Sequence, residues 1–337
     1  MGTSGFNLMV VPLMLMVVSV LAEAGFNRWR GQAVDWRDVG FNFNVGQIIL
    51  WLGRTLEIAV FVWVYQAFSG HWLAAWPAWA SWLFVFVAWD FCFYVLHRAH
   101  HRWRWLWWVH EVHHTGQHFN LSLGVRNAWY SSLTSVPFFL ILALLGATPL
   151  QFVLVSTAHY AIQLFNHNSV LRGYGPLEWL LVSPNLHRVH HGHAEPYLNK
   201  NFGGTLSIWD RLLGTYQPLL PQQPPEFGVK GSLATHNPLK ANHAWLARWR
   251  QEAPLVASAM PKPMAVLAMS LALFGLVLYY IAWQFSWTWW QQGFWVGLLA
   301  VGSVAIGAWA DGQQRLGLHW WCVGIGALGM LAHLWGG

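Results

Sequence analysis

Three short clusters of histidine dominate the sequence, and imidazole is the commonest protein ligand for metal ions near neutral pH. The chain contains 18 histidines. In the first cluster two of them are four residues apart, so on a helix they share a face. The second and third clusters both follow the pattern H-x-x-H-H, whose three imidazoles crowd together on a helix. These clusters supply eight candidate metal ligands, His97, His101, His110, His113, His114, His187, His190 and His191.

Eight histidines exceed the ligand requirement of one ion. A catalytic zinc ion uses about three protein ligands, so we predict two ions, with positions left open for oxygen or substrate. Imidazole sites suit iron, zinc, copper and nickel. The pattern therefore predicts a dimetal site and leaves the metal open.

Histidines outside the clusters are interpreted differently, because an isolated histidine is usually a surface or core residue. His100 and His118 stay ambiguous. His159 lies in an apolar run, where it is either a functional group or a packing hydrogen bond. We favour a loop role over a ligand role for His193. The remaining isolated histidines are read as structural, namely His71, His236, His243, His319 and His333.

The composition indicates that a membrane protein positions these clusters. Only 9% of the 337 residues are charged and 56% are hydrophobic, whereas soluble domains carry roughly 25% charged residues. The net charge of +6 is spread thinly and forms no basic stripe, so we predict no nucleic-acid partner. Cys92 and Cys322 lie in apolar runs and indicate neither a disulfide framework nor a thiolate metal site.

Eight apolar runs predict membrane helices. We expect the first to be a retained helix, because no basic segment precedes it and no small-residue cleavage site follows it. Gly146-Ala147-Thr148-Pro149 predicts a turn between the fourth and fifth runs. Arg28, Arg30 and Arg37 follow the first run, which the positive-inside rule assigns to the cytoplasm. All dense histidine clusters then lie on the cytoplasmic face. The runs cover residues 6–22, 45–68, 76–96, 130–145, 149–165, 264–283, 292–310 and 316–335.

At these clusters the sequence resembles the fatty acid hydroxylase/sterol desaturase superfamily, over about residues 88–239. The segment from Asp90 to His101 resembles the family's D-x-x-x-Y-x-x-H-R-x-x-H motif. The second cluster resembles H-x-V-H-H-S, with Thr115 in place of serine, and the third is similar to H-R-V-H-H-G. Segments 197–204 and 209–216 look like the family's D-K-N-F/Y-G-G and W-D-R-L-F-G-T-F/Y signatures.

Within the superfamily the alkylglycerol monooxygenase-like branch looks closest. Residues 163–167 resemble its Q-F-x-x-H-T segment, which makes His167 a ninth candidate ligand. Leu186 and Asn168 depart from the branch pattern. These departures leave the substrate open and the ligand set intact.

The resemblance implies a non-haem di-iron centre that uses dioxygen to hydroxylate a lipid C–H bond. Asp90 is the best candidate for orienting a ligand imidazole, with an ordinary arginine partner as the alternative. Asn120 and Arg126 are candidates for holding the substrate or bracing the site. The sequence lacks the H-P-G-G segment of a fused cytochrome b5-like domain. We therefore expect a separate electron donor, with tetrahydrobiopterin, a ferredoxin and a cytochrome all open.

The expected fold is all-α, a polytopic membrane helix bundle with a cytoplasmic-face helical cap holding the histidine-rich dimetal site. We expect N-terminal membrane helices over residues 1–87, a catalytic domain over 88–240 and C-terminal membrane helices over 241–337. A lipid desaturase with the same metal site is the nearest alternative, and the sequence does not separate it from a hydroxylase. A membrane metal-binding or metal-transport protein is the alternative of another class.

Overall fold

The structure is a computed structural model that describes residues 7–250, 261–313 and 317–336. Within these ranges the chain forms helices and no strand, and one isolated β-bridge joins Leu181 and Leu206. The predicted all-α fold is therefore confirmed. Phe6 and Leu316, which begin two of the predicted apolar runs, lie outside the described residues.

Five helical segments of the described chain are long and apolar enough to cross a membrane. A sixth helix, Ser131–Leu145, is apolar but shorter. These segments characterise an integral membrane protein. The five are Val10–Trp29, Trp36–Phe68, Ala78–Arg102, Pro263–Ser286 and Trp289–Ala310.

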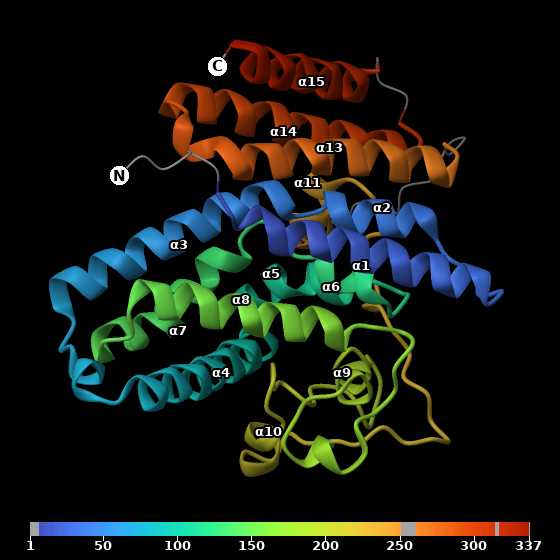
Figure 1. Cartoon of the computed structure of the whole chain (residues 1–337). Coiled ribbons are helices and arrows are strands. Elements are labelled where there is room, and N and C mark those ends of the chain that lie inside the picture. The colour runs from blue at the N-terminus through green and yellow to red at the C-terminus, as the bar shows by residue number, and fades with distance from the viewer. Residues whose placement is uncertain (1–6, 251–260, 314–316, 337) are drawn as a thin grey trace. The chain divides into compact units, whose positions relative to one another are not determined.

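The first of two compact units comprises residues 1–49, 125–129 and 231–337. In this unit α13 packs against α1, α2, α14 and α15, and Figure 1 shows α13, α14 and α15 running side by side. Its helices are α1 (Val10–Trp29), α2 (Trp36–Asn44), α11 (Pro238–Asn242), α12 (Ala244–Trp249), α13 (Pro263–Trp283), η3 (Gln284–Ser286), α14 (Trp289–Ala310) and α15 (Leu318–Gly336).

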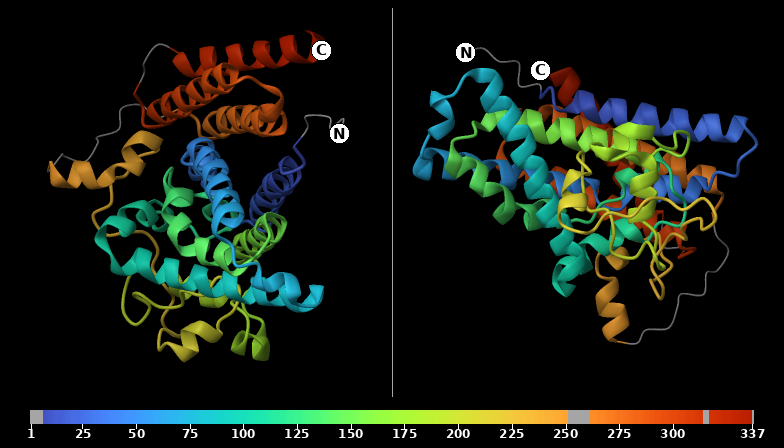
Figure 2. Two further views of the ribbon diagram at one scale, coloured as in Figure 1. Left: turned by 90° about the vertical axis from the view of Figure 1, so that its left-hand side faces the viewer. Right: turned by 90° about the horizontal axis from the view of Figure 1, so that it is seen from below.

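The second unit comprises residues 50–124 and 130–230, and it contains every histidine cluster. In it α4 packs against α5, α7 and α8, and α8 packs against α9. Figure 2 shows these elements from two further sides. Its helices are α3 (Gln47–Phe68, which begins in the first unit), η1 (Trp72–Ala75), α4 (Ala78–Arg102), α5 (Arg104–His114), α6 (Leu121–Val125), α7 (Ser131–Leu145), α8 (Pro149–Asn166), η2 (Gly175–Trp179), α9 (Pro184–His190) and α10 (Ile208–Leu212).

Local sequence explains where the helices that carry the clusters begin and end. Gly146 ends α7 with φ +101°, a left-handed conformation that glycine adopts without a Cβ clash. Thr148 and Gln151 then form a capping box at the start of α8. The predicted turn therefore lies between α7 and α8. The side chain of Ser183 caps α9, just before the third cluster, by accepting from the backbone N–H of Leu186.

Aromatic packing supports α4 and the helices around it. Trp89 on α4 is fully buried and stacks on Phe139 of α7 at 4.7 Å between ring centroids. Phe61 of α3 stacks on Phe152 of α8 at 4.1 Å. Large aromatic side chains with few rotamers make such a core rigid. Packing that does not depend on a metal ion thus holds α4, the helix that carries the first cluster.

The two units do not follow the order of the chain. The expected N-terminal segment, residues 1–87, is divided between them. Residues 50–87 fold with residues 88–124, and residues 1–49 fold with the C-terminal helices. The site described next lies wholly within the second unit.

Candidate metal centre

The structure brings all nine predicted ligands together in two groups. Within each group the candidate ligand nitrogens lie within 4.8 Å of one another. The first group consists of His97, His101, His110, His114 and His190. The second group consists of His113, His167, His187 and His191. Two compact groups of imidazole nitrogens match the two-ion prediction in ligand type and number.

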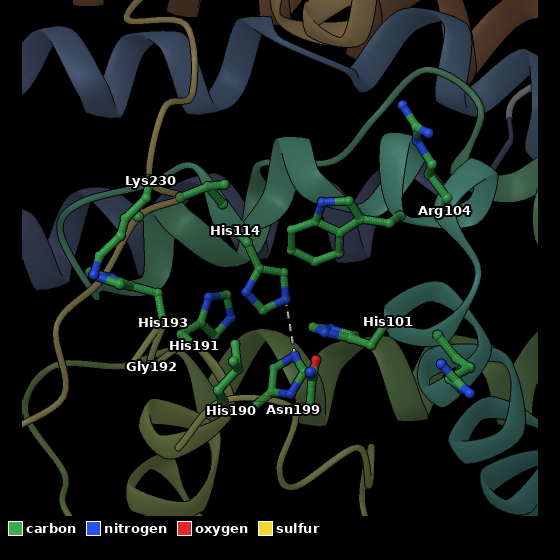
Figure 3. Close-up of a pocket in the computed structure, with 14 residues that line it drawn as sticks. His101, Arg104, His114, His190, His191, Gly192, His193, Asn199 and Lys230 are labelled. Carbon is green, nitrogen blue, oxygen red and sulfur yellow. Dashed lines mark hydrogen bonds between the residues drawn. The ribbon is translucent and has the colours of Figure 1, made fainter. Parts of the chain in front are cut away.

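Each H-x-x-H-H motif divides its imidazoles between the two groups. On α5, His110 and His114 enter the first group and His113 enters the second. The third cluster does the reverse, since His187 and His191 enter the second group and His190 the first. Figure 3 shows His114 and His190 facing one another from the two motifs. Both groups therefore depend on both motifs.

His167 provides the clearest evidence that the groups are built for a cation. Its Nδ1 lies 2.8 Å from the carbonyl oxygen of Gln163, which can only accept a hydrogen bond. A neutral imidazole carries one N–H, so the proton is on Nδ1 and Nε2 presents a lone pair. That Nε2 lies 3.2, 3.2 and 2.9 Å from the Nε2 atoms of His113, His191 and His187 respectively. One lone pair cannot satisfy three such neighbours, whereas a shared cation would.

The first group repeats this arrangement. His97 donates from Nδ1 to the carbonyl oxygen of Phe202 at 2.9 Å, and its Nε2 lies 3.0 Å from Nε2 of His110. His190 donates from Nδ1 to the carbonyl oxygen of Lys200 at 3.0 Å, and its Nε2 lies 3.1 Å from Nε2 of His114. Ligands about 2.1 Å from one ion and at right angles to each other lie about 3.0 Å apart. The nitrogen spacings therefore fit coordination of a metal ion.

Burial prepares the imidazoles for this role. Desolvation, reinforced by neighbouring imidazoles, lowers the pKa of six of these histidines, all outside the membrane spans, well below the ordinary value of the group. At neutral pH these rings are neutral, and neutral imidazole is the form that binds metals. This lowering of the pKa holds for His110, His114, His167, His187, His190 and His191.

A loop of backbone orients the first group. Residues 200–206 supply the Lys200 and Phe202 carbonyl oxygens that accept from His190 and His97. Such acceptors fix the tautomer and the ring orientation of a metal ligand. In this chain they are main-chain carbonyls, which have no signature in the sequence.

Two buried carboxylates hold that loop. Asp210 accepts from the backbone N–H groups of Phe202 and Gly203 at 2.7 and 2.9 Å. Asp90 accepts from the N–H groups of Thr205 and Leu206 at 2.9 and 3.1 Å, and from the indole of Trp209 at 2.8 Å. Burial raises the pKa of Asp210, and the hydrogen bonds from Thr215, Gly203 and Phe202 partly offset that increase. Asp90 thus contacts the loop through backbone and indole donors, and it also lies 3.3 Å from His159.

The other two predicted residues lie away from the nine imidazoles in their described contacts. The side chain of Asn120 accepts from the backbone N–H of Ser122 at 2.9 Å and so caps α6. Arg126 belongs to the first unit, where it donates to Asn42 at 2.6 Å and pairs with Asp38. These contacts agree with bracing, and the roles of both residues at the site stay predictions.

Histidines that the sequence left ambiguous fall outside both groups. His100 contacts the hydroxyl of Thr134 at 3.1 Å and stacks on His110. His159 lies 2.7 Å from the hydroxyl of Thr205 and 3.3 Å from Asp90, so it contacts the loop and the carboxylate that holds it. His193 lies 3.5 Å from Glu226, and His118 is exposed.

The second cluster also fits the H-E-x-x-H motif of zinc proteases, in which two histidines bind zinc and the glutamate is a general base. His110, Glu111 and His114 occupy those positions. Here His110 and His114 belong to a group of five histidines beside a second group of four. A protease zinc site has about three protein ligands, so the surroundings do not match that chemistry.

A pocket of about 480 Å³ opens on the centre. His101, His114 and His190 of the first group and His191 of the second line it, together with Trp107 and Asn199 (Figure 3). The volume lies within the range of about 300–1,000 Å³ that is usual for small-molecule sites. The pocket therefore gives a ligand direct access to the imidazoles.

Comparison with known proteins agrees with this geometry. Residues 82–215 match the fatty acid hydroxylase family. That segment contains all nine histidines as well as Asp90 and Asp210. The resemblance predicted from the motifs is therefore confirmed over this segment.

Curated relatives include proteins of the branch that the sequence resembles. The chain is 34% identical to an alkylglycerol monooxygenase of Danio rerio over 49% of its own length and 36% of that protein. It is 31% identical to the Homo sapiens alkylglycerol monooxygenase over 58% of the chain and 43% of that protein. It is also 30% identical to the ornithine lipid hydroxylase OlsE of Rhizobium tropici, over 56% of the chain and 58% of that protein.

The match thus spans less than half the length of the alkylglycerol monooxygenases from Danio rerio and Homo sapiens. No solved structure gives a significant match. The similarity covers the segment that bears the histidines.

Proposed function

We propose that this chain is a membrane-bound, non-haem di-iron oxygenase that hydroxylates a lipid C–H bond. One observation carries the proposal. Imidazole nitrogens converge in two groups, and in the second of them one lone pair faces three other nitrogens. The names of the relatives, a monooxygenase and a lipid hydroxylase, support the reaction class.

Iron is the metal we propose, because an unactivated C–H bond needs a strong oxidant and side chains supply none. Bound iron would supply the activation of dioxygen, whereas zinc has no redox chemistry. All nine histidines would hold the two ions. The reaction R–H + O2 + 2 e⁻ + 2 H⁺ → R–OH + H2O then balances, with the two electrons coming from a separate donor. We propose tetrahydrobiopterin, a ferredoxin or a cytochrome for that role.

The residues of the chain have separate tasks in this scheme. The low pKa of the cluster imidazoles keeps them neutral as ligands. The loop carbonyls of Lys200 and Phe202 hold the first group in register. The pocket admits the substrate beside His101. We further propose that this face of the membrane is the cytoplasmic one, as the arginines after the first span indicate.

A desaturase is the alternative supported by the same geometry. It would remove two hydrogen atoms from the lipid and reduce dioxygen to two water molecules with the same two external electrons. The compact arrangement of the nine histidines within one unit argues against metal transport, which would distribute ligands along a path across the bilayer.

The proposal is tested by a reaction of the protein with a known iron content. The protein is purified without oxygen, its iron is counted, and oxygen, a reductant and a membrane lipid extract are added. We expect a product that is heavier than its parent lipid by one oxygen atom. A product lighter by two hydrogen atoms would establish the desaturase, and the absence of any oxygen-dependent lipid product with each class of donor would refute both.

A further inference from the structure

Three cationic side chains line the pocket at the metal centre, Arg102, Arg104 and Lys230. All three are exposed. None of them forms an ion pair with an acid anywhere in residues 7–250, 261–313 and 317–336. No Asp or Glu lines the pocket among the described residues. Unpaired charges of one sign around a cavity attract a ligand of the opposite sign.

The neighbouring residues place the pocket mouth at the level of the lipid headgroups. Arg102 ends α4, which is long and apolar enough to span the membrane. Arg102 and Arg104 alternate with Trp103 and Trp105, whose rings are 49% and 57% exposed and stack with centroids 6.0 Å apart. Tryptophan concentrates at the membrane interface, where cationic side chains meet anionic lipid groups.

The distances and the volume favour binding of the headgroup end of a lipid. Arg104 lies over the ring of Trp108 at 5.4 Å, which keeps its charge near the rim. The pocket runs from the cations to the imidazoles of His101 and His114 and holds about 480 Å³. That volume suits a headgroup and the carbons next to it, while the long chains remain on the apolar surface outside.

We propose that this pocket binds the anionic, phosphate- or carboxylate-bearing headgroup of a membrane lipid and that this lipid is the substrate. The inference rests on the proposed lipid hydroxylation and adds the class of headgroup. An uncharged headgroup would remove the three cations from water without pairing them, and burying an unpaired charge costs free energy. An anionic headgroup pairs with them and holds the carbons next to it beside the first histidine group.

A binding measurement without turnover tests this proposal. The full iron-loaded chain, in a neutral detergent and without oxygen, is titrated by calorimetry with dihexanoyl phosphatidate. Dihexanoylglycerol serves as the uncharged counterpart, and inorganic phosphate as the free anion. We expect phosphatidate to bind at least about tenfold more tightly than either of the other two.

Variants locate the site. We expect Arg102→Gln and Lys230→Gln each to weaken phosphatidate binding about tenfold while leaving dihexanoylglycerol binding and the iron content unchanged. Lys262→Gln removes an exposed lysine from the first unit and is the matched control. Normal iron content in the variants shows that they have folded.

The outcomes separate this proposal from the proposed function. Equal affinity for phosphatidate and dihexanoylglycerol, or variants that bind like the wild type, would overturn the anionic headgroup. Inorganic phosphate binding as tightly as phosphatidate would overturn the lipid as its source. Because no oxygen is present, the binding result stands whether or not a product later forms. An oxygen-dependent product without headgroup preference would refute this inference alone.

Discussion

Replacing Asp210 with asparagine tests how the loop at residues 200–206 controls the first metal position. The carboxylate accepts from Phe202 N–H at 2.7 Å, from the Thr215 hydroxyl at 2.8 Å and from Gly203 N–H at 2.9 Å. Asparagine offers one oxygen where aspartate offers two, so a backbone N–H then faces an amide NH2. The loss of a hydrogen bond to a charged group costs about 1.5–3 kcal/mol.

That energy would be lost from the loop conformation that orients His97 and His190. This energy corresponds to a factor of roughly 10 to 150 in the population of that loop conformation. Residues that orient metal ligands typically contribute about 10–100-fold in metal affinity. We therefore expect Asp210→Asn to weaken iron binding at the first group about 10–100-fold. The second group contains His167, which bonds to its own helix at Gln163, so we expect little change there.

Competition with a chelator, followed by iron spectroscopy, measures the two affinities. Asp35→Asn is the matched control, because Asp35 is an exposed carboxylate that caps α2 in the first unit. Because asparagine caps a helix about as well as aspartate, this variant should leave both the stability and the two iron affinities unchanged. Equal weakening at both groups, or none at either, would refute the proposed role of the loop.

Three further results are expected. Gly124→Ala should displace iron from the second group, because the new Cβ would lie 2.9 Å from Nδ1 of His167; Gly25→Ala, with nothing within 4 Å, should be neutral, and full iron binding by the first variant would contradict the packing. His100→Ala should retain both ions, since His100 lies outside both groups; loss of iron would mean that it is a ligand. The melting temperature of the metal-free protein should fall as the pH drops below about 6.5, since the low pKa of His187 and His191 lets only the unfolded state take up their protons there. Each such proton costs up to about 1.4 kcal/mol per pH unit, and a constant melting temperature from pH 8 to 5.5 would contradict it.

The sequence could predict that the clustered histidines converge, because histidines at i, i+3 and i+4 are neighbours on a helix surface. The spacing did not reveal that His113 and His190 each join the group opposite to their own motif partners. That division depends on how α5 and α9 face each other, which is tertiary structure. His167 lies directly after α8 and outside the three clusters. Only the resemblance of its segment to a family motif indicated it.

The supporting residues were harder to predict. Asp90 is predicted to orient a ligand imidazole, and in the structure it holds the backbone of Thr205 and Leu206 and contacts His159, which lies outside both groups. The groups that do accept from ligand imidazoles are main-chain carbonyls, which every residue possesses. Asp210 stood in a recognised signature without an assigned task, because its partners are backbone N–H groups that only folding brings to it. Arg126 is adjacent in sequence to the second unit but folds with the first.

The metal content of one variant tests the central claim most directly. The claim is that two iron ions are bound, one by each histidine group. His187 belongs to the second group, and its Nε2 lies 2.9 Å from that of His167. We expect two iron ions per chain in the anaerobically prepared wild type and one in His187→Ala, with the spectrum of the remaining iron unchanged. Two ions retained in the variant, or fewer than two in the wild type, would contradict the two-group centre.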